Sequence, residues 1–253
     1  MIGFDEGQLV QWLSPLLWPF LRILAVFSVA PMFSSRAFPM RAKVAFAFLI
    51  ALAAQAGLPP GMAISVNDPR ATGVAAQQVM VGLSIGFAVR LIFACMELAG
   101  EVIGFQMGLN FAAFFDPAMG SQSSAMGRFF GQISLLLFVA TNAHLLVIGA
   151  LMRSFEVFPV GDPLLATLAR MPLHQFGAEL FATGFWIALP VVGMLLFTNL
   201  ALGIVSRVAP QMNIFAIGFP ITLVVGMIGV ALTLPMLDQP FQALLGKVIE
   251  RFF

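Results

Sequence analysis

The feature that most constrains this chain is a series of long segments that carry no charged residue. A helix needs roughly 20 apolar residues to cross a bilayer. Strands of a membrane barrel would alternate in polarity over about ten residues, whereas these segments are apolar on every face. The pattern therefore predicts an all-α fold with about six hydrophobic helices. The uncharged windows are 7–21, which continues past Arg22 to Met32, then 44–67, 71–89, 129–152, 180–206 and 208–237.

Composition supports a membrane location. Of the 253 residues, 60% are hydrophobic and only 9% are charged, while a soluble domain carries about a quarter charged residues. The net charge of +1 lacks the basic excess expected of a nucleic-acid-binding protein. Cys95 is the single cysteine, so no internal disulfide can form. The acidic N-terminus does not resemble a secretory signal, and we expect the first apolar segment to be kept.

The distribution of positive charge gives only part of a topology. Arg36, Arg41 and Lys43 lie in the first connection, which the positive-inside rule places in the cytoplasm. With six spans, the later Lys and Arg residues fall almost evenly on both sides. Either the topology is unusual or some of the windows do not face lipid.

A charged stripe lies between the third and fourth uncharged windows, where a long helix is expected to continue. At roughly 100° per residue, Glu97 and Glu101 fall within about 20° of Arg90 around the helix. A solvated helix face, a stack of ion pairs against a partner subunit and a proton relay are all consistent with this pattern, because charges in apolar helices face protein or water rather than lipid.

Glycines repeat every four residues in the same segment. Gly100, Gly104 and Gly108 form one series, and Gly82 and Gly86 repeat the same spacing one expected helix earlier. Because glycine lowers helix stability, such a series indicates that a neighbouring helix approaches closely.

The motifs typical of catalysis are weak or absent in the sequence. Residues 82–86 match G-x-S-x-G, but no strand precedes them, so packing by small residues is favoured over an intramembrane hydrolase that uses Ser84 and His144. His144 and His174 belong to no zinc-binding pair, and there is no Walker A or dinucleotide-binding pattern. We expect no catalytic residue, no metal and no cofactor.

Two polar segments interrupt the apolar background. Residues 106–124 mix small, polar, Met and Phe residues, and Asp116-Pro117 ends the preceding helix. This segment is either a surface loop or a re-entrant, pore-lining loop, since irregular backbone at membrane depth occurs only where it is buried in protein or lines water. Residues 207–215 turn at Pro210 and predict an antiparallel helical hairpin over 180–237, bent at Pro190 and Pro220.

At these residues the sequence resembles the FliR/SctT family of type III secretion export gates. Three stretches carry the resemblance: 31–52 with its core Pro39-Met40-Arg41-Ala42-Lys43-Val44, 104–117, and 205–221 with Arg207-Val208-Ala209-Pro210-Gln211-Met212-Asn213. Together with the order of the hydrophobic windows, the similarity covers essentially the whole chain.

The resemblance implies a hetero-oligomeric assembly of tilted, bent helical hairpins in the bacterial inner membrane, at the base of the flagellar basal body. One copy of this chain would join several FliP-like and FliQ-like subunits, with FlhB-like and FlhA-like export proteins, membrane lipid and unfolded export substrates as further partners. Residues 1–253 would form a single integral membrane unit, with 1–177 similar to FliP and 178–253 to the FliQ hairpin.

The implied function is a structural and gating part of the flagellar export channel, not an enzyme. The alternative is a polytopic small-solute transporter, which would show two related halves. By resemblance the channel plug lies in 106–122, and we expect pore residues there, subunit-packing residues on the charged and glycine stripes, and a polar hairpin tip. These candidates are, in that order, Gln106, Gly108, Asn110, Phe111, Phe114, Phe115, Asp116, Pro117 and Met119; Arg90, Glu97, Gly100, Glu101 and Gly104; and Arg207, Pro210, Gln211 and Asn213.

Overall fold

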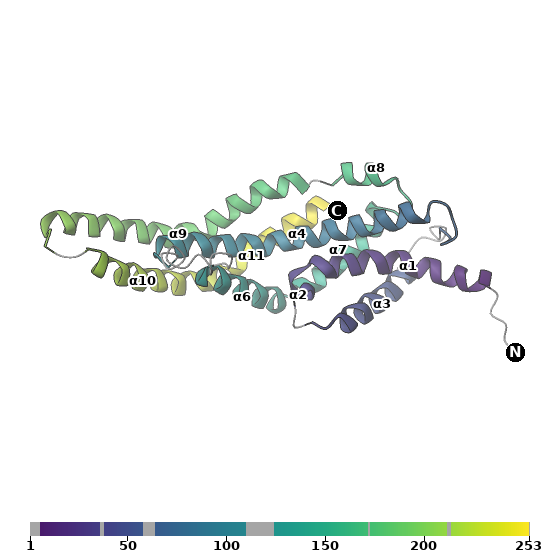
Figure 1. Ribbon diagram of the computed structural model, residues 1–253, viewed down its shortest axis with the longest axis horizontal. Coiled ribbons are helices and arrows are strands. Elements are labelled where there is room, and N and C mark those ends of the chain that lie inside the picture. Colours follow the sequence, from purple (N-terminus) through teal and green to yellow (C-terminus); the bar gives the residue numbers. More distant parts are fainter. Residues whose placement is uncertain are drawn as a thin grey trace. The chain divides into compact units, whose positions relative to one another are not determined.

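The computed structural model describes residues 6–35, 38–57, 64–109, 124–171, 173–211 and 214–252. Throughout these ranges the regular structure is helical and contains no strand, which confirms the predicted all-α class (Figure 1). The helices are α1 (Glu6–Val29), α2 (Pro31–Ser34), α3 (Met40–Gly57), α4 (Ala71–Gln106), α6 (Ala125–Ala140), α7 (Ala143–Val157), α8 (Leu164–Ala169), α9 (Leu173–Val208), α10 (Ile214–Thr233), the 3-10 helix η2 (Leu234–Met236) and α11 (Asp238–Phe252).

Fewer helices qualify as membrane spans than the six hydrophobic windows predicted. By length and composition, three described helical segments could cross a membrane: Ala71–Gln106, Gln175–Val208 and Ala216–Met236. A fourth arises only if α6 and α7 are counted together, because the window 129–152 is broken between them. Asn142 lies at the break with a φ of 55°, a left-handed conformation that asparagine tolerates better than most residues.

The chain forms two compact units. The first comprises Met1–Leu91, Asn142–Phe176 and Leu245–Phe253, and the second comprises Ile92–Thr141 and Gly177–Leu244. The continuous helix α4 contributes its first part to one unit and its last part to the other. The predicted division into a FliP-like part, 1–177, and a FliQ-like hairpin, 178–253, stays a prediction.

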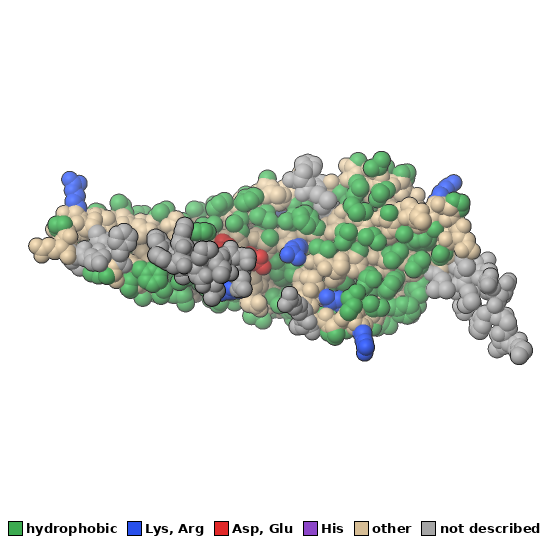
Figure 2. All heavy atoms as spheres, viewed as in Figure 1, with side chains coloured by type: hydrophobic (Ala, Val, Ile, Leu, Met, Phe, Trp, Pro, Cys, Tyr) green, Lys and Arg blue, Asp and Glu red, His purple; other side chains and the backbone are tan. Residues whose placement is uncertain are grey.

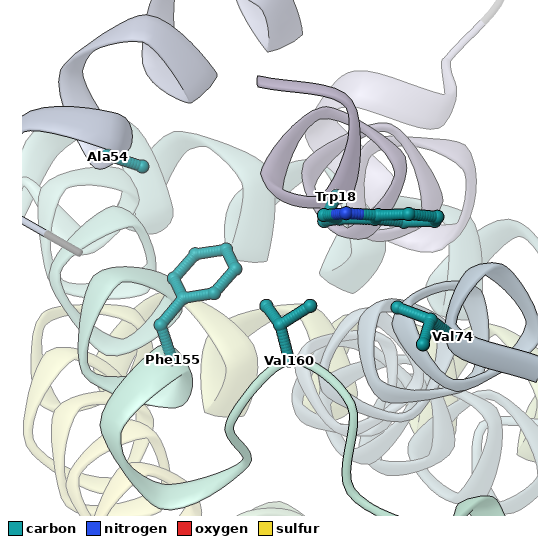
Figure 3. Close-up of a cluster of buried hydrophobic side chains, with 5 residues drawn as sticks. All are labelled: Trp18, Ala54, Val74, Phe155 and Val160. Atoms are coloured by element: carbon teal, nitrogen blue, oxygen red, sulfur yellow. The ribbon is translucent and has the colours of Figure 1, made fainter. Parts of the chain in front are cut away.

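Four helices of the first unit meet in a buried hydrophobic cluster. Trp18 from α1, Ala54 from α3, Val74 from α4, Phe155 from α7 and Val160 from the following segment converge there (Figure 3). The indole nitrogen of Trp18 also donates a hydrogen bond of 2.9 Å to a backbone carbonyl of the 64–70 connection. The cluster thus ties helices that are far apart in sequence to one core.

Glycines bring α4 against α1 within this unit. A Cβ added at Gly82 would collide with the carbonyl oxygen of Arg22 and lie 2.7 Å from the Cβ of Ala25. One added at Gly86 would lie 2.9 Å from the carbonyl oxygen of Val26. The close helix approach predicted from this glycine pair is confirmed. Ser84 between them lies inside α4, and not at the strand-to-helix turn that a G-x-S-x-G nucleophile requires.

In the second unit, α9 and α10 form the predicted antiparallel hairpin. A Cβ added at Gly229 of α10 would lie 2.6 Å from the methyl carbon of Met194 and 3.2 Å from a methyl carbon of Val191, both on α9. The two helices run side by side in Figure 1, and each contains the proline expected to bend it, Pro190 in α9 and Pro220 in α10.

The span-like helices differ in how far the chain itself covers them. Over an apolar stretch of 18 residues in each helix, 61% of the residues are buried in α4, but only 22% in α9 and 28% in α10. Large apolar side chains such as Trp186, Phe197 and Leu232 are more than half exposed. Hydrophobic atoms occupy much of the face shown in Figure 2, and Lys and Arg side chains are few. The hairpin therefore presents an apolar surface that water would not solvate favourably.

Candidate functional site

The candidate subunit-packing residues of α4 contact the beginning of α6 in the second unit. A Cβ at Gly100 would lie 2.5 Å from the carbonyl oxygen of Met126. A Cβ at Gly104 would lie 3.2 Å from the Cβ of Met126 and 3.3 Å from the hydroxyl oxygen of Ser124. Glycine at both positions lets the first turn of α6 lie directly on the α4 backbone. The glycine stripe thus packs helices within this chain.

The two acidic residues of the stripe lie over glycines of α6. A carboxylate oxygen of Glu101 accepts a hydrogen bond of 2.7 Å from the backbone N–H of Ser124. The same side chain occupies the space beside Gly127, where an added Cβ would collide with it. One turn earlier on α4, Glu97 lies beside Gly131, where an added Cβ would be 3.2 Å from the carboxylate. Arg90, the third member of the stripe, is exposed.

Sequence reasoning missed the α6 side of this contact. Ser124, Gly127 and Gly131 receive the α4 stripe, and none of them was expected to do so. The available signal was the four-residue spacing of Gly127 and Gly131, which matches that of Gly100 and Gly104. Two such series are a sign that the helices carrying them pack against each other.

The C-terminal end of α4 packs on α10. Met107 is fully buried, and a Cβ added at Gly226 would lie 2.5 Å from its Cγ. The hydroxyl of Thr222 donates a hydrogen bond of 3.3 Å to the carbonyl oxygen of Met107. Gly108 follows with a φ of 78°, a conformation that favours glycine, and Phe219 lies against it. Gln106, the last residue of α4, is half-buried.

Most of the predicted plug lies outside the described residues. Of the pore candidates, the structure describes Gln106, the last residue of α4, and Gly108 in the turn after it. It does not describe Asn110, Phe111, Phe114, Phe115, Asp116, Pro117 and Met119.

The predicted polar hairpin tip follows α9. Arg207 is an exposed residue in the last turn of α9, and Pro210 and Gln211 form an exposed turn after it. Asn213 lies outside the described residues. The tip therefore offers a cation and polar groups on the surface of its own unit.

A buried arginine network was not predicted and lies in the first unit. Arg22 has no exposed surface, and its guanidinium donates hydrogen bonds to the carbonyl oxygens of Ser154, at 2.8 Å, and Phe158, at 2.7 Å. It also donates to the side-chain oxygen of Gln78 at 2.7 Å and lies 4.1 Å from the ring centroid of Phe155. Arginine stays charged in proteins, so this buried cation binds the carbonyl-rich C-terminal end of α7.

The network continues through two glutamines of α4. Gln78 donates to the side-chain oxygen of Gln77 at 2.9 Å, and Gln77 donates to the carbonyl oxygen of Pro159 at 2.9 Å. The backbone N–H of Gly161 donates back to Gln77 at 3.1 Å. These bonds hold the turn after α7 against α4. We therefore interpret the network as structural.

Candidate metal ligands do not gather in the described ranges. There, no group of three His, Cys, Asp or Glu side chains is placed to hold an ion. Cys95 is a buried free thiol that packs in the interior of the second unit.

These features are those of a multi-pass α-helical membrane protein. Glycines spaced four residues apart bring its helices into close contact. The chain matches the family of bacterial export proteins, family 1, over residues 13–248, and it belongs to that family.

Curated relatives share nearly the whole length of the chain. The flagellar biosynthetic protein FliR of Escherichia coli (strain K12) is 39% identical over 241 residues, which cover 95% of this chain and 92% of that protein. The FliR of Pectobacterium carotovorum subsp. carotovorum is 38% identical over 250 residues, covering 99% and 95%. The FliR of Bacillus subtilis (strain 168) is 32% identical over 228 residues, covering 88% and 86%. The chain is thus a member of the FliR family, which implies a role in flagellar export.

Proposed function

We propose that this chain is a structural and gating component of the flagellar type III export channel, through which unfolded flagellar subunits cross the inner membrane at the base of the basal body. The observation that carries the proposal is the near full-length similarity to flagellar biosynthetic FliR proteins. In this function the chain has no catalytic activity of its own, and energy comes from partner proteins or an ion gradient.

The partners are FliP-like and FliQ-like subunits, several of each around one copy of this chain, with FlhB-like and FlhA-like export proteins alongside. The low burial of α9 and α10 supports this part of the proposal, because their apolar side chains need a cover other than water. The exposed Arg90 contacts those subunits, while Gly100, Gly104 and Glu101 pack on α6.

The channel is occluded at rest by the segment 106–122, with Phe111, Phe114, Phe115, Met119 and the Asp116-Pro117 turn as the occluding residues. Met and Phe side chains suit this task because they are apolar and adapt their shape. The residues that flank this segment, Met107 and Ser124, are each held by a hydrogen bond to another helix.

Deletion of residues 111–119 tests the gating function. With the occluding side chains removed, we expect a higher passive ion flux through the assembled gate, measured as membrane depolarisation in cells that express it, with unchanged recovery of the complex. The matched control is a deletion confined to the N-terminal residues 1–5. An ion flux equal to that of the control, with the complex intact, would count against the plug. A saturable flux of one small solute would instead favour the transporter alternative.

A further inference from the structure

The first turn of α6 has an unusual arrangement of caps. Ser124 is the N-cap residue, with φ −57° and ψ 163°, and its hydroxyl accepts a hydrogen bond of 3.0 Å from the backbone N–H of Gly127. Gly127 is the third residue of the helix, the N3 position. This is one half of a capping box, in which the N-cap side chain binds the N3 amide.

The other half of a capping box is normally supplied by Glu or Gln at N3, whose side chain accepts from the backbone N–H of the N-cap residue. Here N3 is glycine and has no side chain. The backbone N–H of Ser124 donates instead to the carboxylate of Glu101, at 2.7 Å, from a different helix. The acceptor that α6 lacks is therefore supplied by α4.

The space beside Gly127 is occupied by the side chain of Glu101. The three atoms nearest to a Cβ added at Gly127 are Oε1, Cδ and Cγ of Glu101, with Cδ at 2.9 Å and Cγ at 3.2 Å. A side chain at N3 would therefore require the carboxylate of Glu101 to move from this position. A Cβ added at the neighbouring Gly100 would lie 3.0 Å from the Cα of Gly127. Glycine at this position therefore lets the backbones of α4 and α6 come close enough for the Glu101 carboxylate to reach the amide of Ser124.

We propose that Glu101 is the acidic half of a capping box built across two helices, and that it is the positioning residue that fixes the start of α6 on α4. The carboxylate also lies at the N-terminal end of α6, where the helix dipole favours negative charge. The start of α6 directly follows the segment 110–123 in the sequence. Any effect of Glu101 on gating therefore rests on the proposed function.

The test uses the whole complex and a compensating pair of substitutions. Glu101→Ala removes the acceptor of the Ser124 amide together with the three atoms that crowd Gly127. Gly127→Glu in the same chain then restores an acidic N3 residue and completes an ordinary capping box. The matched control is Glu101→Ala with Ala125→Glu, which places the same charge in the same turn, at the exposed position N1, where it cannot form the box.

Hydrogen exchange of the amides of residues 124–128 is the first measurement. We expect exchange to be about fivefold faster in Glu101→Ala, as for loss of a helix cap, to return towards the wild-type rate with Gly127→Glu, and to stay fast with Ala125→Glu. Equal recovery with both added glutamates, or unchanged exchange in Glu101→Ala, would overturn the capping box. If Glu101→Ala lowers assembly, the yield of the complex is compared instead, and the same order of variants is expected.

Ion flux through the assembled gate is the second measurement. We expect Glu101→Ala to raise it, by less than the deletion of 111–119, and Gly127→Glu to reverse the rise. The positioning role would be overturned if the deletion raises the ion flux and Glu101→Ala leaves it unchanged. A deletion without effect would contradict the proposed gating function and leave the exchange measurement as the decisive test of the capping box.

Discussion

At the scale of single residues, the buried guanidinium of Arg22 connects α1 with α4 and with the end of α7. In the sequence it interrupts an apolar helix and separates two uncharged stretches. Its partners Gln78, Ser154 and Phe158 lie 56, 132 and 136 residues away. No local pattern indicates which residues will surround a buried cation, because the partners come together only through the tertiary fold.

Replacing Arg22 tests its anchoring role. Arg22→Ala removes the donor to the carbonyl oxygen of Phe158 and to the side-chain oxygen of Gln78, at about 1–3 kcal/mol for each group left unsatisfied. The carbonyl oxygen of Ser154 keeps the backbone N–H of Phe158 as a donor. We expect a large drop in the apparent melting temperature of the detergent-solubilised protein, followed by fluorescence-detected size exclusion. Arg22→Lys should fall between, because lysine lacks the planar fork of donors. The exposed Arg70 provides the control, and an Arg22→Ala protein as stable as Arg70→Ala would contradict the network.

At the scale of helices, glycine spacing predicted close packing but not the packing partner. The Gly82 and Gly86 pair indicated a near neighbour, and the structure identifies it as α1. The spacing is a local property of the sequence, whereas the choice of neighbour depends on the whole fold. The break between α6 and α7 was likewise unexpected, because a single asparagine in an uncharged window is a weak signal for a left-handed residue.

Two glycines of α4 separate the effect of packing from that of helix propensity. An added methyl group at Gly82 meets the α1 backbone at Arg22, which cannot move aside as a flexible side chain can, while a Cβ at Gly73 meets no atom within 4 Å. We expect Gly82→Ala to destabilise the protein by about 1–3 kcal/mol, as overpacking does. Gly73→Ala should be neutral or slightly stabilising, since alanine favours a helix by up to about 1 kcal/mol over glycine.

Thermal unfolding of the two variants under the same detergent conditions makes this comparison. Equal melting temperatures for Gly82→Ala and Gly73→Ala would show that α1 and α4 are not held at the distance described.

At the scale of the whole molecule, the all-helical class and the C-terminal hairpin could be predicted from the sequence, because uncharged windows and a proline turn are local signals. The number of spans could not. Among the residues that the structure describes, three helices qualify by length and composition, and α6 and α7 together form a fourth at most. The windows record apolarity but not whether a helix packs inside the protein, as much of α4 does, or presents its apolar side chains outward, as α9 and α10 do.

The exposed apolar surface of α9 and α10 bears directly on the central claim, that this chain functions as one subunit of an export channel. Side chains such as Phe197 and Leu200 remain largely exposed in the isolated chain. In a bilayer, either lipid or close packing against other subunits can cover such a surface. In the proposed function other subunits cover it, so the chain should be recovered as part of a larger complex.

Native mass spectrometry of the tagged chain, purified in mild detergent from membranes of its own cells, tests this claim most directly. The account predicts a complex with one copy of this chain and several copies each of two other small hydrophobic proteins. A stable monomer or homodimer without those proteins would contradict it.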